Sequence, residues 1–198
     1  MKKLDILFKK EIKDFVYSSK CWILFFFVIL GEKVIIKRNH DAYNIYFHFW
    51  WITFTVQQFI YDSFLTDVRE KGTLFLCNAK IKFLNYYLVK CLFCAAIMIL
   101  MLSGEIHRIV KISNALQVLF LFSLSMMVVP VEYFMLILAK GNEAVGIILS
   151  NLIMGALFLL LTKLPASVLT VLLGVAINVL FYVAVNMAQK SLYFRKLI

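Results

Sequence analysis

The chain has 198 residues and a formal net charge of +10, with 63% hydrophobic and only 16% charged residues. Soluble domains contain roughly 45–50% apolar and about 25% charged residues, so this composition excludes an ordinary soluble domain with one small core. The positive charge does not favour nucleic-acid binding, because the apolar pattern leaves no basic soluble domain to present it. We therefore predict an all-α, polytopic membrane protein that forms a single domain over residues 1–198.

Residues 1–20 predict an amphipathic helix that lies in the inner membrane interface. Lysines cover one face together with Glu11 and Asp14, and they suit anionic lipid headgroups. A basic segment that only fixes orientation remains the alternative. The apolar residues recur at three- and four-residue spacing and are Leu4, Leu7, Phe8, Ile12, Phe15 and Val16.

Six later segments are apolar enough to predict membrane spans, since a bilayer requires about 20 residues per helix. The first is interrupted by Glu32 and Lys33, and a secretory signal peptide is its alternative interpretation. We retain it as an uncleaved helix because no small-residue cleavage site follows it. The predicted spans are Cys21 to Ile36, Asn44 to Leu65, Tyr87 to Ser103, Ala115 to Ala139, Ala144 to Thr162 and Ala166 to Ala188.

Basic residues orient these spans. With the N terminus inside, the inner segments hold 14 Lys and Arg residues and the outer segments hold 6. Cytoplasmic loops of membrane proteins are enriched in Lys and Arg. We therefore expect both termini to lie in the cytoplasm.

The central polar segment, residues 66–86, carries the most distinctive pattern. Gly72 permits a sharp turn, and the apolar residues after it lead back toward the membrane. This pattern predicts a cytoplasmic helix-turn-helix suited to binding a soluble partner. Its candidate contact residues are Asp67, Arg69, Glu70, Lys71, Gly72, Thr73, Leu74 and Phe75.

In this segment the chain resembles the permease subunits of type-2 ABC transporters. Those permeases commonly carry an acidic residue, then Gly-Thr-Leu, a small polar run, an aromatic residue and a Lys that opens the third span. The matching residues here are Glu70, Gly72, Thr73, Leu74, Tyr86, Tyr87 and Lys90. The N-terminal elbow helix, the six spans and the Leu164-Pro165 step also resemble that family.

The chain departs from the family pattern in three places. Phe75 stands where Glu is common, the usual Pro after the small polar run is absent, and the outer connection between the last two spans is very short. The last departure argues against outer re-entrant helices, which many relatives use to close the external gate.

The resemblance implies that energy comes from another chain. The only Gly-x4-Gly here, Gly141 to Gly146, is followed by two isoleucines and lacks the Lys of a phosphate-binding loop. We expect this subunit not to be an enzyme, and to bind no cofactor. ATP and Mg²⁺ would be bound by a separate nucleotide-binding ATPase subunit, which would dock on residues 66–86.

Polar and small residues inside the spans are candidates for the transport path. Glu132 in span four is costly in lipid and is expected to face the path, a partner helix or a cavity, and Pro130 should kink the same helix. Gln57 and Gln58 could line the same cavity. A purely structural role for Glu132, protonated or paired, stays open. Gly146 and Ser150, one turn apart, would permit close helix packing.

Other chemistry has little support. The three histidines and four cysteines form no metal-binding or hydrolase motif. The resemblance implies the transmembrane subunit of an exporter in the bacterial inner membrane, paired with a second permease protomer and moving an amphipathic substrate such as an antimicrobial peptide or a lipid-like compound. A non-transport immunity or sensor scaffold and a heme-export permease remain alternatives.

Overall fold

The computed structural model describes residues 2–17, 22–23, 26, 44–69, 82–103, 114–139 and 142–196. Within these ranges the chain is helical, with short turns and no strand, which confirms the predicted all-α class. The helices are α1 (Lys2–Tyr17), α3 (Asn44–Arg69), α5 (Phe83–Ser103), α7 (Ala115–Ser125), α8 (Val128–Leu138), α9 (Glu143–Leu161) and α10 (Val168–Lys196).

Four helical segments are long and apolar enough to cross a membrane, and they coincide with the third to sixth predicted spans. The first predicted span, Cys21 to Ile36, lies outside the described residues except for three positions. The second corresponds to α3, which is long enough but does not qualify on hydropathy, so the predicted total of six spans is not confirmed. The four segments are Phe83–Ser103, Ala115–Leu138, Ala144–Leu161 and Val168–Ala188.

The polar helix α3 lies at the centre of the molecule. It packs against α1, α5, α7, α8 and α9, and these neighbours cover its polar side chains as well as its apolar ones. Enclosure by protein explains how a helix with this composition is accommodated among more apolar ones. Its buried polar residues include His48, Thr53, Thr55, Gln57 and Asp67.

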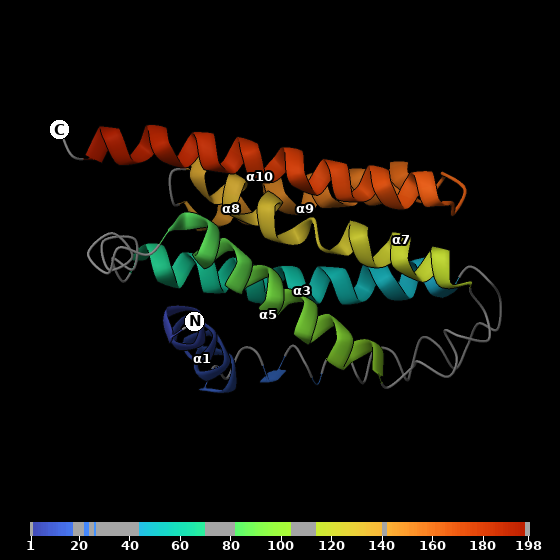
Figure 1. The fold of residues 1–198 in the computed structure, drawn as a ribbon, viewed down its shortest axis with the longest axis horizontal. Helices are drawn as coiled ribbons and strands as arrows, with labels where there is room; N and C mark the ends of the chain where they lie inside the picture. The colour runs from blue at the N-terminus through green and yellow to red at the C-terminus, as the bar shows by residue number, and fades with distance from the viewer. Residues whose placement is uncertain are drawn as a thin grey trace.

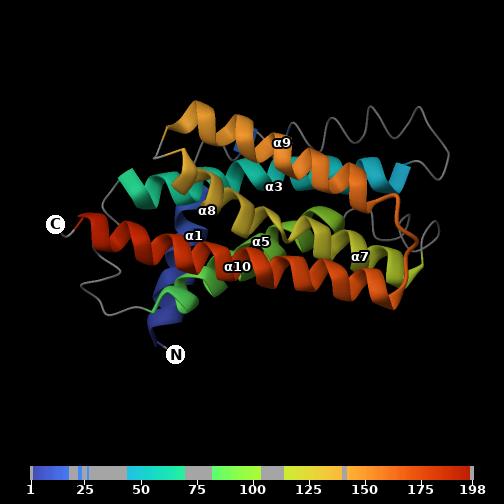
Figure 2. The ribbon, with the colours of Figure 1, turned by 90° about the horizontal axis from the view of Figure 1, so that it is seen from above.

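The long helices run roughly along one axis, whereas α1 crosses them near one end (Figures 1 and 2). At that end α3 finishes, α5 begins, α8 finishes and α9 begins. The C-terminal helix α10 also finishes there, so both chain ends lie toward the same end of the bundle (Figure 1).

The fourth predicted span is broken into α7 and α8 at Met126 and Met127. Pro130 has no N–H, and its ring would collide with the carbonyl of Met126, four residues earlier. The helical hydrogen bonds tighten there. The N–H of Met127 donates to the Leu124 carbonyl and the N–H of Val129 donates to the Met126 carbonyl, each only three residues earlier instead of four. The kink expected from Pro130 is therefore present, one turn before the proline.

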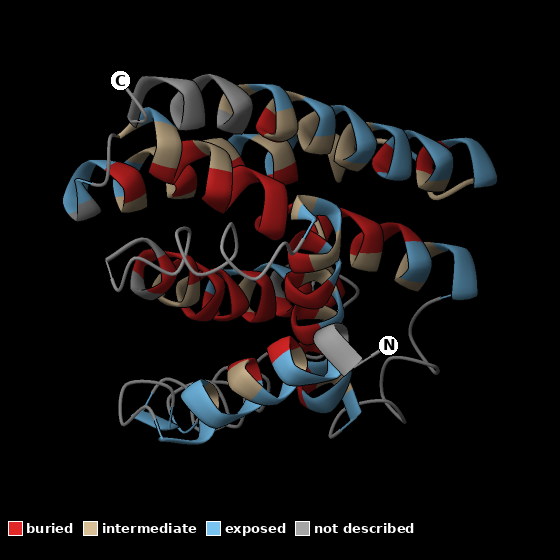
Figure 3. Cartoon of the chain, turned by 60° about the vertical axis from the view of Figure 1, so that its left-hand side comes forward, coloured by how far each residue is buried: buried red, intermediate tan, exposed pale blue. Residues whose placement is uncertain are grey.

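The last two helices form a peripheral hairpin. Residues 162–167 connect α9 to α10 through turns and contain no helix, as the short connection in the sequence indicated. Only 22% of the α9 span and 17% of the α10 span are buried, against 67% for α7 and α8 together. Much of α10 is accordingly exposed in Figure 3, which leaves broad apolar faces for lipid or protein.

Candidate functional site

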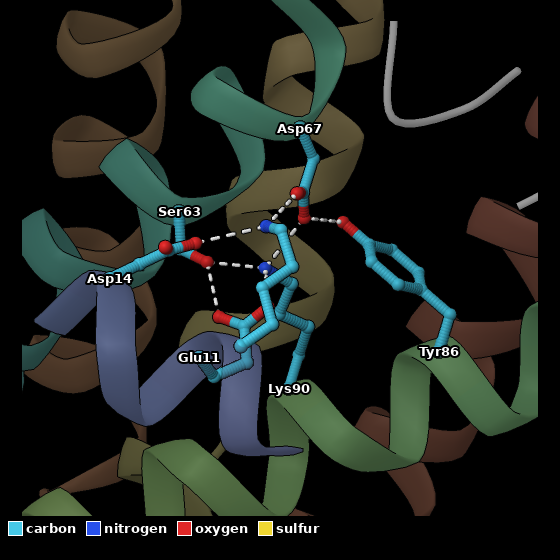
Figure 4. Close-up of polar contacts among 7 residues, drawn as sticks. Glu11, Asp14, Ser63, Asp67, Tyr86 and Lys90 are labelled. Atoms are coloured by element: carbon cyan, nitrogen blue, oxygen red, sulfur yellow. Dashed lines mark hydrogen bonds and ion pairs between the residues drawn. The ribbon is translucent and has the colours of Figure 1, made fainter. Parts of the chain in front are cut away.

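Six residues from three helices form a largely buried polar cluster, hereafter the charge cluster, which Figure 4 shows together with Asp14 of α1. It lies where α1 crosses the end of α3 and the beginning of α5. The amphipathic helix and both helices that flank residues 70–81 therefore meet in one set of contacts. The charge cluster consists of Lys10 and Glu11 of α1, Ser63 and Asp67 of α3, and Tyr86 and Lys90 of α5.

Lys90 is the centre of the charge cluster. Its side chain is fully buried, and its Nζ lies 2.6 Å from Glu11 Oε1 and 2.7 Å from Asp67 Oδ2. It also donates a hydrogen bond to the Ser63 hydroxyl, which in turn donates to Glu11 Oε2 at 2.5 Å. A buried ammonium needs such partners, because losing its hydration without them costs several kcal/mol, by order of magnitude.

Aromatic rings complete the surroundings of this ammonium. Lys90 Nζ lies 5.2 Å from the ring centres of both Phe64 and Tyr86, within range of a cation–π interaction. The rings exclude water from the cation while still favouring its charge. The geometry therefore holds Lys90 as a fixed internal cation.

Asp67 joins all three helices. Its Oδ1 accepts a hydrogen bond from Lys10 Nζ at 2.6 Å, and its Oδ2 accepts one from the Tyr86 hydroxyl at 2.7 Å. Burial disfavours the carboxylate, but the positive charges of Lys90 and Lys10 outweigh that effect and lower the pKa of Asp67. Burial likewise disfavours the Lys10 ammonium, yet the attraction of Asp67 raises the pKa of Lys10. Within the charge cluster two cations thus face two carboxylates, and Lys10 also pairs with the exposed Asp14 at 3.0 Å.

Only some of the predicted partner-contact residues belong to the part of the chain that the structure describes. Glu70, Lys71, Gly72, Thr73, Leu74 and Phe75 lie outside the described residues, and Arg69 is the last residue of α3. Asp67 was predicted as a contact for a partner, but its side chain is only 8% exposed and points into the charge cluster. In the described part of the segment, Asp67 therefore connects α3 to α1 and α5 inside the protein.

The sequence pattern placed Glu11 on the polar face of the first helix with the lysines, and the structure shows that this was wrong. Glu11 is 3% exposed and faces Lys90. The reason is its spacing: Leu7, Glu11 and Phe15 follow one another at four-residue steps, so they share the face that packs on the bundle. An acidic residue in an apolar stripe and a lysine inside a later span were the two signals of this ion pair.

A second polar group lies deeper in the bundle, between α3, α8 and α9. Glu132 of α8 is fully buried, and neither of its carboxyl oxygens has a hydrogen-bond partner among the described residues. Gln57 of α3 and Ser150 of α9 face this carboxyl, and Gln57 Nε2 donates to Ser150 Oγ at 3.2 Å. Three of the predicted polar and packing positions are therefore brought together.

Two other candidates from the sequence have different surroundings. Gln58 is half-buried, because neighbouring residues on a helix point about 100° apart and Gln57 takes the inward direction. Pro130 is buried and acts through the break between α7 and α8.

Gly146 permits the close approach of α9 to α3. A Cβ added there would collide with the hydroxyl of Tyr61. Gly146 and Ser150 therefore both face α3, which agrees with the packing role expected from their spacing.

Comparisons with known protein families, with curated proteins and with solved structures found no match for this chain.

Proposed function

We propose that this chain is the membrane-spanning permease subunit of an ATP-driven exporter, and that a separate nucleotide-binding subunit moves it through residues 66–86. In this proposal α3 is a further span that its neighbours shield from lipid. The observation that carries the proposal is the charge cluster, which ties together the elements on both sides of that segment.

The position of the charge cluster is suited to transmitting movement. Asp67 lies three residues before the 70–81 segment, and Tyr86 and Lys90 follow it closely. Both ends of the segment are therefore joined to each other and, through Glu11 and Lys10, to α1. A push on the segment would move α1, α3 and α5 together, because separating Lys90 from Glu11 would leave a buried carboxylate without its cation.

The surroundings of the segment support a cytoplasmic partner. The bundle end that holds α1 also holds the finish of α10, and the inner segments predicted from the sequence carry the excess of basic residues. α1 lies across the bundle there, as an interfacial helix would (Figure 2). A soluble ATPase would thus meet the segment and the elbow helix on one surface.

The transported compound would be amphipathic, such as a small antimicrobial peptide or a lipid-like molecule. A second permease protomer, identical or homologous, would complete the pathway. These two features follow from the resemblance of the central segment to type-2 ABC permeases.

The test is affinity purification of the chain from its native membrane in mild detergent, followed by mass spectrometry and an ATPase assay. We expect a nucleotide-binding protein to co-purify, and the double change Glu70→Lys with Gly72→Pro to abolish both its recovery and the ATPase activity. The matched control is Lys163→Glu in the connection between α9 and α10, which is exposed and far along the chain from the segment.

Two results would overturn the proposal. One is unchanged recovery of the ATPase and unchanged transport in the Glu70/Gly72 variant. The other is full activity of the purified chain with no nucleotide-binding partner, which is the outcome expected for an immunity or sensor protein.

A further inference from the structure

Glu132 is a buried ionisable group that lies outside the charge cluster. It is fully enclosed by protein, and both of its carboxyl oxygens lack a hydrogen-bond partner among the described residues. Its polar neighbours are neutral: the Gln57 amide from α3 and the Ser150 hydroxyl from α9.

The described parts of the helices packed against α8 bring no cation to this carboxyl. Those helices are α3, α5, α9 and α10, and only the two neutral groups act on it. Lys90, the buried cation of α5, is already paired with Glu11 and Asp67. The titratable groups of these helices and of α8 itself have contacts of their own, among them His48, Tyr61, Asp62, Asp67, Tyr86, Tyr87, Cys91, Tyr133 and Tyr182.

An ionised carboxylate in these surroundings would be strongly unfavourable. Removing an ionised carboxylate from water without a counter-charge costs far more free energy than removing the neutral acid does. One bound proton removes the charge and also supplies an O–H donor. The Ser150 hydroxyl oxygen, which lies beside this carboxyl, can accept from that donor.

We propose that Glu132, together with Gln57 and Ser150, forms an exchangeable proton-binding site at the junction of α3, α8 and α9. The neutral acid permits these helices to pack closely. Loss of the proton places a charge that must be hydrated or paired at the same junction, so proton release loosens α8 from α3 and α9. The site stands on this geometry alone and does not depend on the proposed transport function.

The direct test is infrared spectroscopy of the purified protein with ¹³C-labelled glutamate. At neutral pH we expect a protonated carboxyl band that is absent from Glu132→Gln, and that disappears from the wild type as the pH is raised to 10. An ionised Glu132 at neutral pH would overturn the proposal. So would a protonated band that persists at pH 10, because the proton would then be permanent. Glu132→Asp, which keeps an acid and shifts the band, gives the same assignment if Glu132→Gln does not fold.

A second measurement compares the unfolding equilibrium of the wild type and Glu132→Gln in detergent from pH 5 upward. A group that holds its proton more tightly when folded stabilises the protein fully at low pH and loses that contribution as the pH rises. The ratio of the two unfolding constants should change by about tenfold per pH unit until the buried acid ionises. Parallel pH profiles for the two proteins would contradict the proposal.

Discussion

Lys90 of α5 and Glu11 of α1 form an ion pair that is sealed from solvent, with 2.6 Å between Nζ and Oε1, although the two residues are 79 positions apart in the chain. Each charge requires the other, since neither has access to water. The pair therefore fixes α1 to the bundle far more specifically than its apolar contacts would.

Replacing Lys90 with Met should destabilise the folded protein strongly. It leaves the carboxylates of Glu11 and Asp67 buried with too little positive charge, and breaking a buried pair from one side costs about 3–5 kcal/mol. The free energy of unfolding in mixed detergent micelles measures this loss.

The double variant Lys90→Met with Glu11→Gln supplies the control. Because it removes both members of the pair, its loss should be smaller than the sum of the two single losses. Strict additivity would show that Glu11 and Lys90 do not stabilise each other.

Asp67 predicts an acid-sensitive contribution to stability. Its pKa is lowered in the folded state: burial opposes ionisation, but Lys90 and Lys10 outweigh it. The contribution is present above the unfolded pKa of roughly 3.9 and is lost as the pH falls through the folded value. Thermal unfolding from pH 7 to pH 2 should thus show the difference between wild type and Asp67→Asn shrinking only below about pH 4.

Lys10 predicts the opposite dependence at alkaline pH. Its pKa is raised by Asp67 in spite of burial, so its contribution is complete below the unfolded pKa of roughly 10.4 and is lost as the pH rises through the folded value. Up to about pH 10 the difference between wild type and Lys10→Met should stay constant. A difference that decays between pH 7 and pH 9 would exclude this ion pair.

Gly146 and Gly155, on the same helix, provide a matched comparison. Gly146→Ala places a methyl group against the Tyr61 hydroxyl and should cost about 1–3 kcal/mol, whereas a Cβ at Gly155 meets nothing within 4 Å. Gly155→Ala should instead be neutral or stabilising by up to about 1 kcal/mol. Equal effects on the free energy of unfolding would show that α9 does not approach α3 at Gly146.

Pro130→Ala should straighten the break between α7 and α8. The substitution restores an N–H that can donate to the Met126 carbonyl. Spin labels at the exposed residues Leu119 and Leu138 should then move apart in pulsed electron–electron distance measurements. Labels at Ile148 and Leu159 on α9 are the control pair, and their separation should not change.

Local patterns in the sequence predicted most helices well. Continuous apolar runs predicted the bounds of α5, α9 and α10 to within a few residues, except that α10 extends further at its C-terminal end. The proline predicted the break in the fourth span. Such features depend on neighbouring residues, and for that reason they can be read from one sequence.

The charge cluster could not be predicted in the same way. The exposure of Glu11 was wrongly assigned because a helix face is identified by its average polarity, and one acidic residue does not change that average. Which partner Lys90 selects depends on how α1 crosses α5, and the crossing is set by tertiary packing. Glu132 was recognised as costly, whereas its neighbours from α3 and α9 became evident only in the structure.

The enclosure of α3 has a consequence for how the protein is made. As a span of the proposed transporter, α3 leaves the ribosome before α5, α8 and α9, which later cover its polar side chains. Its composition gives it a weaker signal for the translocon than the four more apolar helices give. We therefore expect α3 to complete its integration only when those later helices arrive, so that a ribosome-bound chain ending before α5 would leave it accessible to water-soluble reagents.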